Sequence, residues 1–348
     1  MKRIVLAYSG GLVTSAAIAW LAEQQGAEIV TVTLDFGQAR ELAPVRERAL
    51  ALGAARAHVI DVRDELVRDF MLPALHAGAL TGGHALTRSL IATRLLDVAR
   101  MEAAAAVAHG GEPGSRSEAA LHATIVALDP GLEVIAPARQ WGLSAPELVT
   151  YARSRGVHVA PAERHRTDAS LWGRVVTLGA DAVPDAFTLT RSPEDSPDDP
   201  ALLDIEFSSG VPIRVNGVEM SMIEMIESLE TIAGAHGVGR IEEEGAVIEA
   251  PAVTVLSVAH RELETYVVGA DLAALKAGLS SLYADAMVNG RWFSDIRAAI
   301  AGFAQVVQPR VTGTIRLRLL KGRCDVVQCH SVNAAVPAAQ PTTSGVVA

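Results

Sequence analysis

The chain has 348 residues, of which 50% are hydrophobic and 20% charged, and its formal net charge is −10. This composition is typical of a folded globular protein with room for two domains, and it excludes disorder along most of the chain. The negative charge argues against nucleic-acid binding, and the lack of any run of 18 or more uncharged apolar residues predicts no transmembrane helix.

The first half of the chain alternates short apolar strands with helices. Strands are predicted at residues 3–7, 28–36, 58–62 and 133–136, and helices at 15–24, 39–52, 89–108, 117–128 and 144–155. Alternation at these lengths predicts a parallel sheet with helical crossovers, which is an α/β fold.

The pattern changes near Pro161. A polar loop with three prolines at 191–200 is followed by predicted strands at 203–207 and 212–215, with a hairpin turn at 208–210, and by a half-exposed strand at 312–319. Helices are predicted at 222–233, 271–288 and 294–306, so this half is expected to be mixed α+β. The last residues, from 333 onward, are predicted to be disordered.

The apolar stretch at the N-terminus is too short for a signal peptide and runs directly into a glycine turn. The two cysteines, Cys324 and Cys329, lack a neighbouring histidine cluster and are predicted to be ordinary thiols. A reducing, cytoplasmic location is therefore the default expectation.

The strongest local signal is residues 7–15, which read Ala-Tyr-Ser-Gly-Gly-Leu-Val-Thr-Ser. This segment joins the first strand to the first helix, at the carboxyl edge of a parallel sheet, where ligands bind. Its two glycines permit a tight turn and close backbone approach, and free amides at a helix start stabilise phosphate. A simple structural turn is the alternative, since the segment matches neither the dinucleotide motif nor the Walker motif.

This loop resembles the PP-loop of the argininosuccinate synthase family, Ser-Gly-Gly-x-Asp-x-Ser. Further similar segments follow in the family's order, at residues 33–38, 108–110, 135–139, 168–174, 236–241, 259–264 and 290–294. The resemblance implies a ligase that uses ATP to adenylate a substrate oxygen, releases pyrophosphate, and lets a nitrogen nucleophile displace AMP.

The resemblance also implies a domain organisation. A parallel-sheet PP-loop ATP-binding domain is expected at residues 1–163. A mixed α+β substrate and oligomerisation domain with a C-terminal helix is expected at 164–331, followed by a tail at 332–348. Because the family assembles through its C-terminal region, a cytoplasmic homotetramer that acts on small molecules is expected.

The residues expected to hold ATP, together with Mg²⁺, lie on the loop and on two neighbouring strand ends. They are Ala7, Tyr8, Ser9, Gly10, Gly11, Thr14, Ser15, Leu34 and Gly110. Substrate contacts are expected from Ser89, Glu112, Arg116 and Arg166, with Glu112 as the candidate base for an amine nucleophile. No protein-bound metal site is predicted, because His84, His109 and His122 are not spaced as ligands on one helix.

The chain departs from the family pattern at several positions. Val13 replaces the loop aspartate, which either alters the ATP chemistry or leaves binding to backbone amides and water. The family sequence His-Gly-Cys-Thr-Gly-Lys-Gly-Asn-Asp-Gln-Val-Arg-Phe-Glu corresponds to residues 109–122, where Glu112, Arg116, Ser117 and Ala120 replace Thr, Asn, Asp and Arg. Each hydrogen-bonding partner that a buried polar ligand loses costs about 1–3 kcal/mol.

These replacements favour an AMP-forming ligase for substrates other than citrulline and aspartate. Two alternatives stay open: a divergent but genuine argininosuccinate synthase, and a regulatory homologue without turnover. The motif Gly234-x-x-Gly237-x-Gly239 follows a predicted helix and is interpreted as a structural turn.

Overall fold

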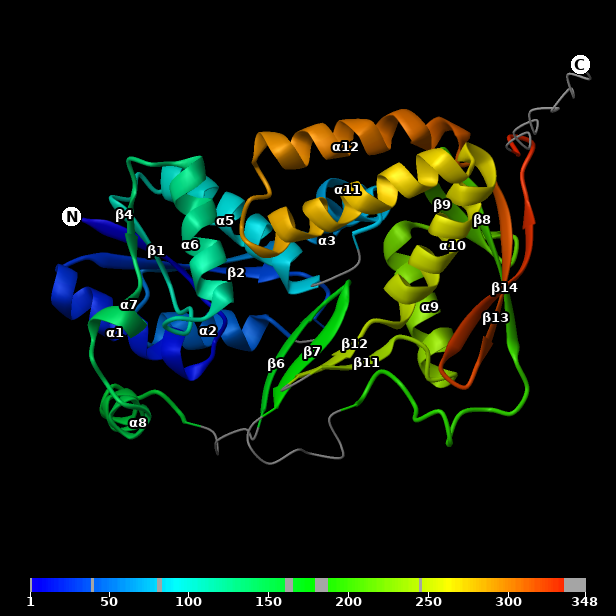
Figure 1. The fold of residues 1–348 in the computed structure, drawn as a ribbon. Helices are drawn as coiled ribbons and strands as arrows, with labels where there is room; N and C mark the ends of the chain where they lie inside the picture. The colour runs from blue at the N-terminus through cyan, green and yellow to red at the C-terminus, as the bar shows by residue number, and fades with distance from the viewer. Residues whose placement is uncertain are drawn as a thin grey trace, which may run out of the picture.

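The structure is a computed structural model that describes residues 2–38, 41–79, 83–159, 165–178, 187–243 and 246–334. It has a mixed α/β architecture with one parallel sheet and two antiparallel sheets, shown in Figure 1. None of the helices in these ranges combines the length and the apolar character needed to cross a bilayer.

A five-stranded parallel sheet forms the first half of the chain. Its strands are β1 (Arg3–Ala7), β2 (Glu28–Asp35), β3 (Arg56–Asp61), β4 (Ala106–His109) and β5 (Glu133–Ile135). Their order is β3-β2-β1-β4-β5, and every neighbouring pair is parallel. Because the chain moves outward from β1 to β3 and then returns to the other side of β1, the order reverses between β1 and β4. Ligands bind at such a reversal, beyond the carboxyl ends of the strands.

Helices cover both faces of this sheet because β1 is buried on both sides. Ile4 and Leu6 pack in one apolar cluster with α1 (Leu12–Gln25) and α2 (Ala43–Ala51), while Val5 belongs to the cluster of α5 (Gly83–Met101) on the other face. The remaining helices of this half are α6 (Arg116–Leu128), the short α7 (Pro137–Gln140) and α8 (Ala145–Ser154). This packing fixes the end of β1 between α1 and β4.

Two antiparallel sheets build the second half. One has the order β10-β9-β8-β13-β14, and the other the order β11-β12-β7-β6. The first consists of β8 (Ala201–Ser208), β9 (Val211–Val215), β10 (Val218–Glu219), β13 (Gly313–Leu320) and β14 (Arg323–His330). The second consists of β6 (His165–Ser170), β7 (Gly173–Leu178), β11 (Arg240–Glu243) and β12 (Ala246–Glu249). In Figure 1 the β6–β7 hairpin lies between the parallel sheet and α9.

Four longer helices complete this half: α9 (Met222–Ala235), α10 (Pro251–Val268), α11 (Ala270–Val288) and α12 (Asp295–Val307). Short helical segments lie at α3 (Arg63–Glu65), η1 (Leu66–Met71), α4 (Leu72–Ala77) and η2 (Gln308–Arg310). One apolar core joins residues of the parallel sheet, such as Val32, to residues of the antiparallel sheet, such as Phe207.

The alternation of strands and helices and the 208–210 hairpin turn are confirmed. The predicted helix at 89–108 is wrong at its end, because α5 ends at Met101 and residues 106–109 form β4, a strand that was not predicted. The alanine-rich run favours a helix by propensity, but its buried place between β1 and β5 makes it a strand. The predicted helix at 294–306 is α12, but it is not the last element, because β13 and β14 follow it and extend the second sheet. The helix at 251–268 and the β6–β7 hairpin were not predicted. Gly237 and Gly239 both have positive φ in the turn after α9, as expected for a structural turn. The predicted tail lies outside the described residues from 335 onward.

Candidate functional site

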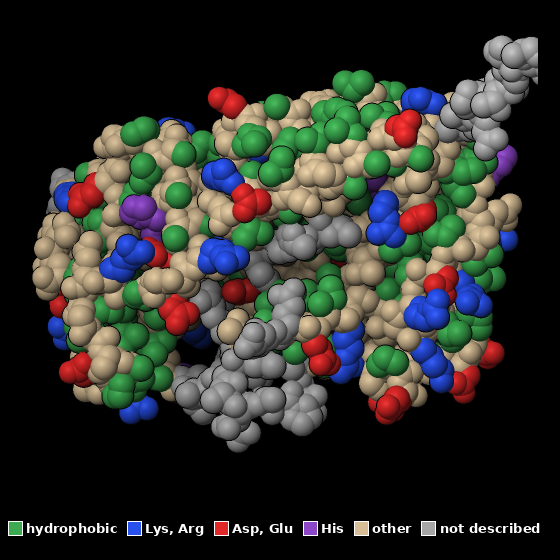
Figure 2. Space-filling model, in the orientation of Figure 1, with side chains coloured by type: hydrophobic (Ala, Val, Ile, Leu, Met, Phe, Trp, Pro, Cys, Tyr) green, Lys and Arg blue, Asp and Glu red, His purple; other side chains and the backbone are tan. Residues whose placement is uncertain are grey.

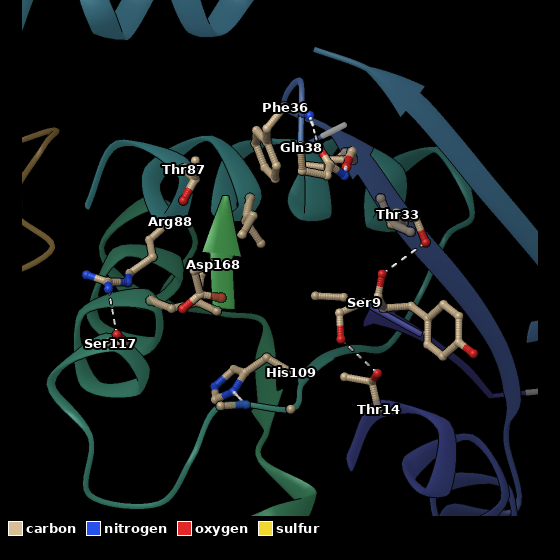
Figure 3. Close-up of a pocket in the computed structure, with 18 of the residues that line it drawn as sticks. Ser9, Thr14, Thr33, Phe36, Gln38, Thr87, Arg88, His109, Ser117 and Asp168 are labelled. Carbon is tan, nitrogen blue, oxygen red and sulfur yellow. Dashed lines mark hydrogen bonds between the residues drawn. The ribbon is translucent and has the colours of Figure 1, made fainter. Parts of the chain in front are cut away.

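A cavity of about 470 Å³ lies at the carboxyl ends of β1, β2 and β4, where the strand order reverses. A volume of this size is typical of a small-ligand site. Its lining comes from the glycine loop, β2, α5, the segment after β4, and β6 (Figure 3). The cavity therefore combines elements of both halves of the chain.

The glycine loop presents an uncapped helix start to this cavity. Gly10 has a φ of 75°, which favours glycine, and Gly11 is the N-cap of α1 without a side-chain hydrogen bond to the first turn. The first amides of a helix have no partner within the helix, so those of α1 are available to an anion. Arg48 Nη1 donates to the Gly10 carbonyl at 2.9 Å and fixes the loop from α2.

Hydroxyl groups brace the same loop. Ser9 Oγ and Thr14 Oγ1 lie 3.2 Å apart across the turn, as Figure 3 shows. Tyr8 is buried, its hydroxyl lies 3.1 Å from Ser15 Oγ, and its carbonyl accepts from Thr33 Oγ1 at 2.9 Å. Ser15 is thus part of the support of the loop, whereas Ser9 and Thr14 line the cavity itself.

Gly110 brings β4 against the start of α1. A Cβ at this position would lie 2.5 Å from Thr14 Cγ2 and 3.3 Å from Val13 Cγ1, so only glycine fits. Val13 therefore packs beside Gly110 as an apolar contact. The loop holds no carboxylate, so an ion that accompanies ATP would be held by the phosphates and the Ser9 and Thr14 hydroxyls.

The end of β2 forms a second wall. Gln38 accepts from the Phe36 amide at 2.6 Å and donates to the Leu34 carbonyl at 2.9 Å, which closes a tight turn. The Leu171 amide, in the turn between β6 and β7, donates to the Phe36 carbonyl at 2.8 Å. Leu34 and Phe36 give this wall an apolar surface suited to a flat ring such as a nucleobase.

The opposite end of the cavity is polar and carries both signs of charge. Arg88, on α5, donates to Ser117 Oγ at 2.5 Å, and Asp168 on β6 and Glu112 in the loop after β4 also line this end. These charged groups would meet the substrates rather than the phosphates.

The structure brings most of the predicted nucleotide residues to one cavity. Ala7, Tyr8, Ser9, Thr14, Leu34 and Gly110 line it, and Gly10, Gly11 and Ser15 shape the loop behind them. This arrangement fits a nucleoside triphosphate, because an uncapped helix start faces an open cavity beside an apolar wall.

The predicted substrate residues are less well gathered. Glu112 lines the cavity, but Ser89 is fully buried behind it and Arg116 is exposed at the start of α6, and neither belongs to the described lining. The side chain of Arg166 lies outside the described part of the chain. Asp168 and Ser117 do line the polar end. Asp168 could have been identified from the sequence, because it is the first residue of the family-like segment at 168–174.

His109 ends β4 in the cavity wall. It is 1% exposed, and burial lowers its pKa to about 4, so its ring is neutral at neutral pH. Glu118 on α6, also 1% exposed, faces the same region and contacts the Arg139 guanidinium.

Comparison with known proteins gives a consistent result. The model of the "Arginosuccinate synthase N-terminal HUP domain" matches residues 3–158, and that of the "Arginosuccinate synthase C-terminal domain" matches residues 167–338. The chain belongs to the argininosuccinate synthase family. Members of this family are ATP-dependent, AMP-forming C–N ligases.

Three similar relatives are proteins named argininosuccinate synthase. The chain is 38% identical to that of Rubrobacter xylanophilus, over 93% of this chain and 85% of the relative. It is 39% identical to that of Symbiobacterium thermophilum, over 92% and 86%, and 38% identical to that of Synechococcus elongatus, over 94% and 87%. The similarity to argininosuccinate synthases thus extends through both halves of the chain.

Proposed function

We propose that this chain is a working AMP-forming ligase whose acceptor and amine differ from citrulline and aspartate. The observation that carries the proposal is the uncapped start of α1, which opens onto a 470 Å³ cavity with a charged far end. In this reaction the substrate oxygen attacks the α-phosphorus of ATP and pyrophosphate leaves. The amine nitrogen then displaces AMP from the activated substrate.

The loop residues have a direct role in this chemistry. The α1 amides and the Ser9 and Thr14 hydroxyls hold the phosphates and so place the α-phosphorus near the polar end of the cavity. Glu112, at that end, is the candidate base that accepts a proton from the amine.

The departure from the usual substrates is supported by the surroundings of three replaced positions. Ala120 is buried, and its backbone lies against Gly290, so it offers the cavity no polar group where the family has arginine. Ser117, which replaces an aspartate, accepts from Arg88. Glu112, which replaces a threonine, adds a negative charge that would repel a carboxylate substrate at close range.

A second candidate function is argininosuccinate synthesis itself. It is supported by the relatives, which are named argininosuccinate synthase and are 38–39% identical over more than nine-tenths of this chain. Backbone amides and Arg88 would then replace the lost side-chain contacts to aspartate.

Pyrophosphate release separates these functions. The purified chain is incubated with ATP and Mg²⁺, first with citrulline plus aspartate at millimolar concentrations, then with a panel of amide, ureido and carboxylate acceptors paired with amines. Release with citrulline plus aspartate establishes the second candidate, and release only with another pair supports the proposal. ATP binding without pyrophosphate release in the presence of any substrate pair would support the third possibility, a homologue without turnover.

We also propose the domain boundaries expected from the sequence, 1–163 and 164–331, and assembly into a homotetramer through the second half. Exposed apolar side chains on α11 and at α12 support the assembly, and Figure 2 shows hydrophobic surface where Figure 1 places these helices. The exposed apolar side chains are Leu275, Leu282, Phe293, Ile296 and Val306. Light scattering of the purified chain tests the assembly.

A further inference from the structure

Three buried or half-buried side chains beside the cavity lie close together, and each has a buried polar atom without a partner. His109 Nε2, Glu118 Oε1 and His122 Nδ1 each lack a hydrogen-bond partner among the described residues. The three residues each offer one ligand atom, and these atoms lie within 4.8 Å of one another. Buried polar atoms normally have partners, so three unpartnered atoms on neighbouring side chains indicate a missing binding partner.

The fold holds these side chains in place. Glu118 and His122 are four residues apart on α6, so they project from the same face of the helix. His109 ends β4, and its ring lies edge-to-face to that of His122, with ring centroids 6.0 Å apart. Gly111 permits this approach, because a Cβ there would lie 2.6 Å from Glu118 Cγ.

The Glu118 carboxylate is oriented by a neighbour. Arg139 contacts its Oε2 atom, which leaves Oε1 without a hydrogen-bond partner and available to a ligand. Carboxylates that bind metal ions are commonly held in place by a second hydrogen-bonding group in this way. His109 and Glu118 also line the cavity, which gives an ion a route of entry and leaves a coordination position open to the cavity.

We propose that His109, Glu118 and His122 bind a late first-row divalent cation of the Zn²⁺ class at the cavity wall. Two imidazoles and one carboxylate suit such ions, whereas Mg²⁺ and Ca²⁺ prefer oxygen ligands alone. Bonds of about 2.0–2.1 Å place tetrahedral ligand atoms roughly 3.4 Å apart, so small side-chain rotations bring the three atoms onto one ion. The site is distinct from the Mg²⁺ that accompanies ATP, and it does not rest on the proposed ligase activity.

One existing contact changes when the ion binds. The Gly111 amide donates to His109 Nδ1 at 3.3 Å, at the long end of the hydrogen-bond range. With Nε2 on the ion, Nδ1 carries the ring proton, so the Gly111 peptide has to turn away. The loss of one long hydrogen bond is small beside the formation of three metal–ligand bonds.

The test uses metal ions alone, without nucleotide. The full chain is treated with a chelator, dialysed, and titrated with Co²⁺ and then Zn²⁺. One equivalent of Co²⁺ should bind with the visible absorption of a low-coordinate ion, and Zn²⁺ should displace it. His122→Gln and Glu118→Gln should each weaken binding about tenfold or more. Glutamine at position 118 is the residue of the family sequence.

His158→Gln is the matched control, because His158 is exposed and distant from these residues in the sequence. Its affinity should equal that of the parent, and circular dichroism should show that all variants are folded. The absence of a bound equivalent in the parent would overturn the proposal. So would Co²⁺ binding that both His122→Gln and Glu118→Gln leave unchanged.

Discussion

Gly110 and Thr14 are in such close contact that a Cβ on residue 110 would lie 2.5 Å from Thr14 Cγ2. The end of β4 therefore limits where the glycine loop can lie. We expect Gly110→Ala to push Thr14 out of place and to weaken ATP binding by about tenfold or more, measured by calorimetry, since roughly 1.4 kcal/mol is a factor of ten. Gly278→Ala is the control. This glycine is in α11 with open space around it, so alanine there should stabilise the chain slightly and leave ATP affinity unchanged.

A second substitution tests the turn of the loop. Gly10 has a φ of 75°, which valine rarely adopts, so Gly10→Val should abolish measurable ATP binding by deforming the loop. Gly53 has a φ of 98° with no heavy atom near its missing Cβ and lies outside the cavity lining. Gly53→Val should therefore carry similar backbone strain but keep the parent's ATP affinity. Equal ATP affinity of Gly10→Val and the parent would show that the loop is not the nucleotide site.

Glu112 is expected to act in the transfer step. If it is the base for the amine, Glu112→Gln should lower kcat by about 10²- to 10⁴-fold while ATP binding stays the same. Single-turnover kinetics with an active substrate pair checks this. A kcat within twofold of the parent value would show that Glu112 is not the base for the amine.

Stability depends on one buried carboxylate in the second half. Glu249 is fully buried, accepts from the backbone amides of Thr188, Leu189 and Thr190, and pairs with Arg174 at 2.8 Å. Removing it leaves these donors buried without an acceptor, so Glu249→Ala should lower the free energy of unfolding by about 3–5 kcal/mol. Denaturant titration measures the change. The exposed Glu242→Ala should change stability by about 0.5 kcal/mol or less.

Acid should destabilise the chain through its buried histidines, which include the neighbouring His76 and His260 as well as His109. Burial lowers the pKa of His76 to about 4 and that of His260 to about 3, so both rings stay neutral in the folded protein. The unfolded chain takes up protons below its ordinary histidine pKa near 6.5. The contribution of these neutral rings to the free energy of unfolding is therefore fully present above pH 6.5. It falls as the pH drops toward 4, by up to about 1.4 kcal/mol per pH unit for each ring.

The neighbours of these rings modify the slope. The charge of Lys276 lowers the pKa of both rings further. Burial raises the pKa of Glu264, so protonation of this carboxyl in acid stabilises the folded chain and opposes the loss caused by the histidines. The clearest window is therefore between pH 6.5 and 5. His76→Gln should show a shallower fall in unfolding free energy across that window. An unchanged slope would mean that His76 is already protonated in the folded state.

The glycine-loop end of the cavity could be predicted because its signal is local. Residues 7–15 contain the turn, the hydroxyls and the helix start in a single segment, and the strand alternation places that segment at the sheet edge. The polar end could not be predicted in the same way, because its side chains come from α5, the loop after β4, α6 and β6, which are spread widely along the sequence.

Helix rotation explains the two substrate residues that do not line the cavity. Neighbouring positions on a helix point about 100° apart, so Arg88 reaches the cavity while Ser89 is buried. In the same way Ser117 lines the cavity and Arg116 faces solvent. The Glu118–His122 spacing of four residues was visible in the sequence, but only the packing of β4 against α6 adds His109 to the pair.

The β6–β7 hairpin, which follows the first half in the chain, supplies residues 167–170 to the cavity wall. The glycine loop and this hairpin wall are thus encoded in separate stretches of sequence, whereas Arg88, Glu112 and Ser117 lie in the same half as the loop. Substitutions in the hairpin can consequently reshape one wall of the cavity without changing the residues of the loop.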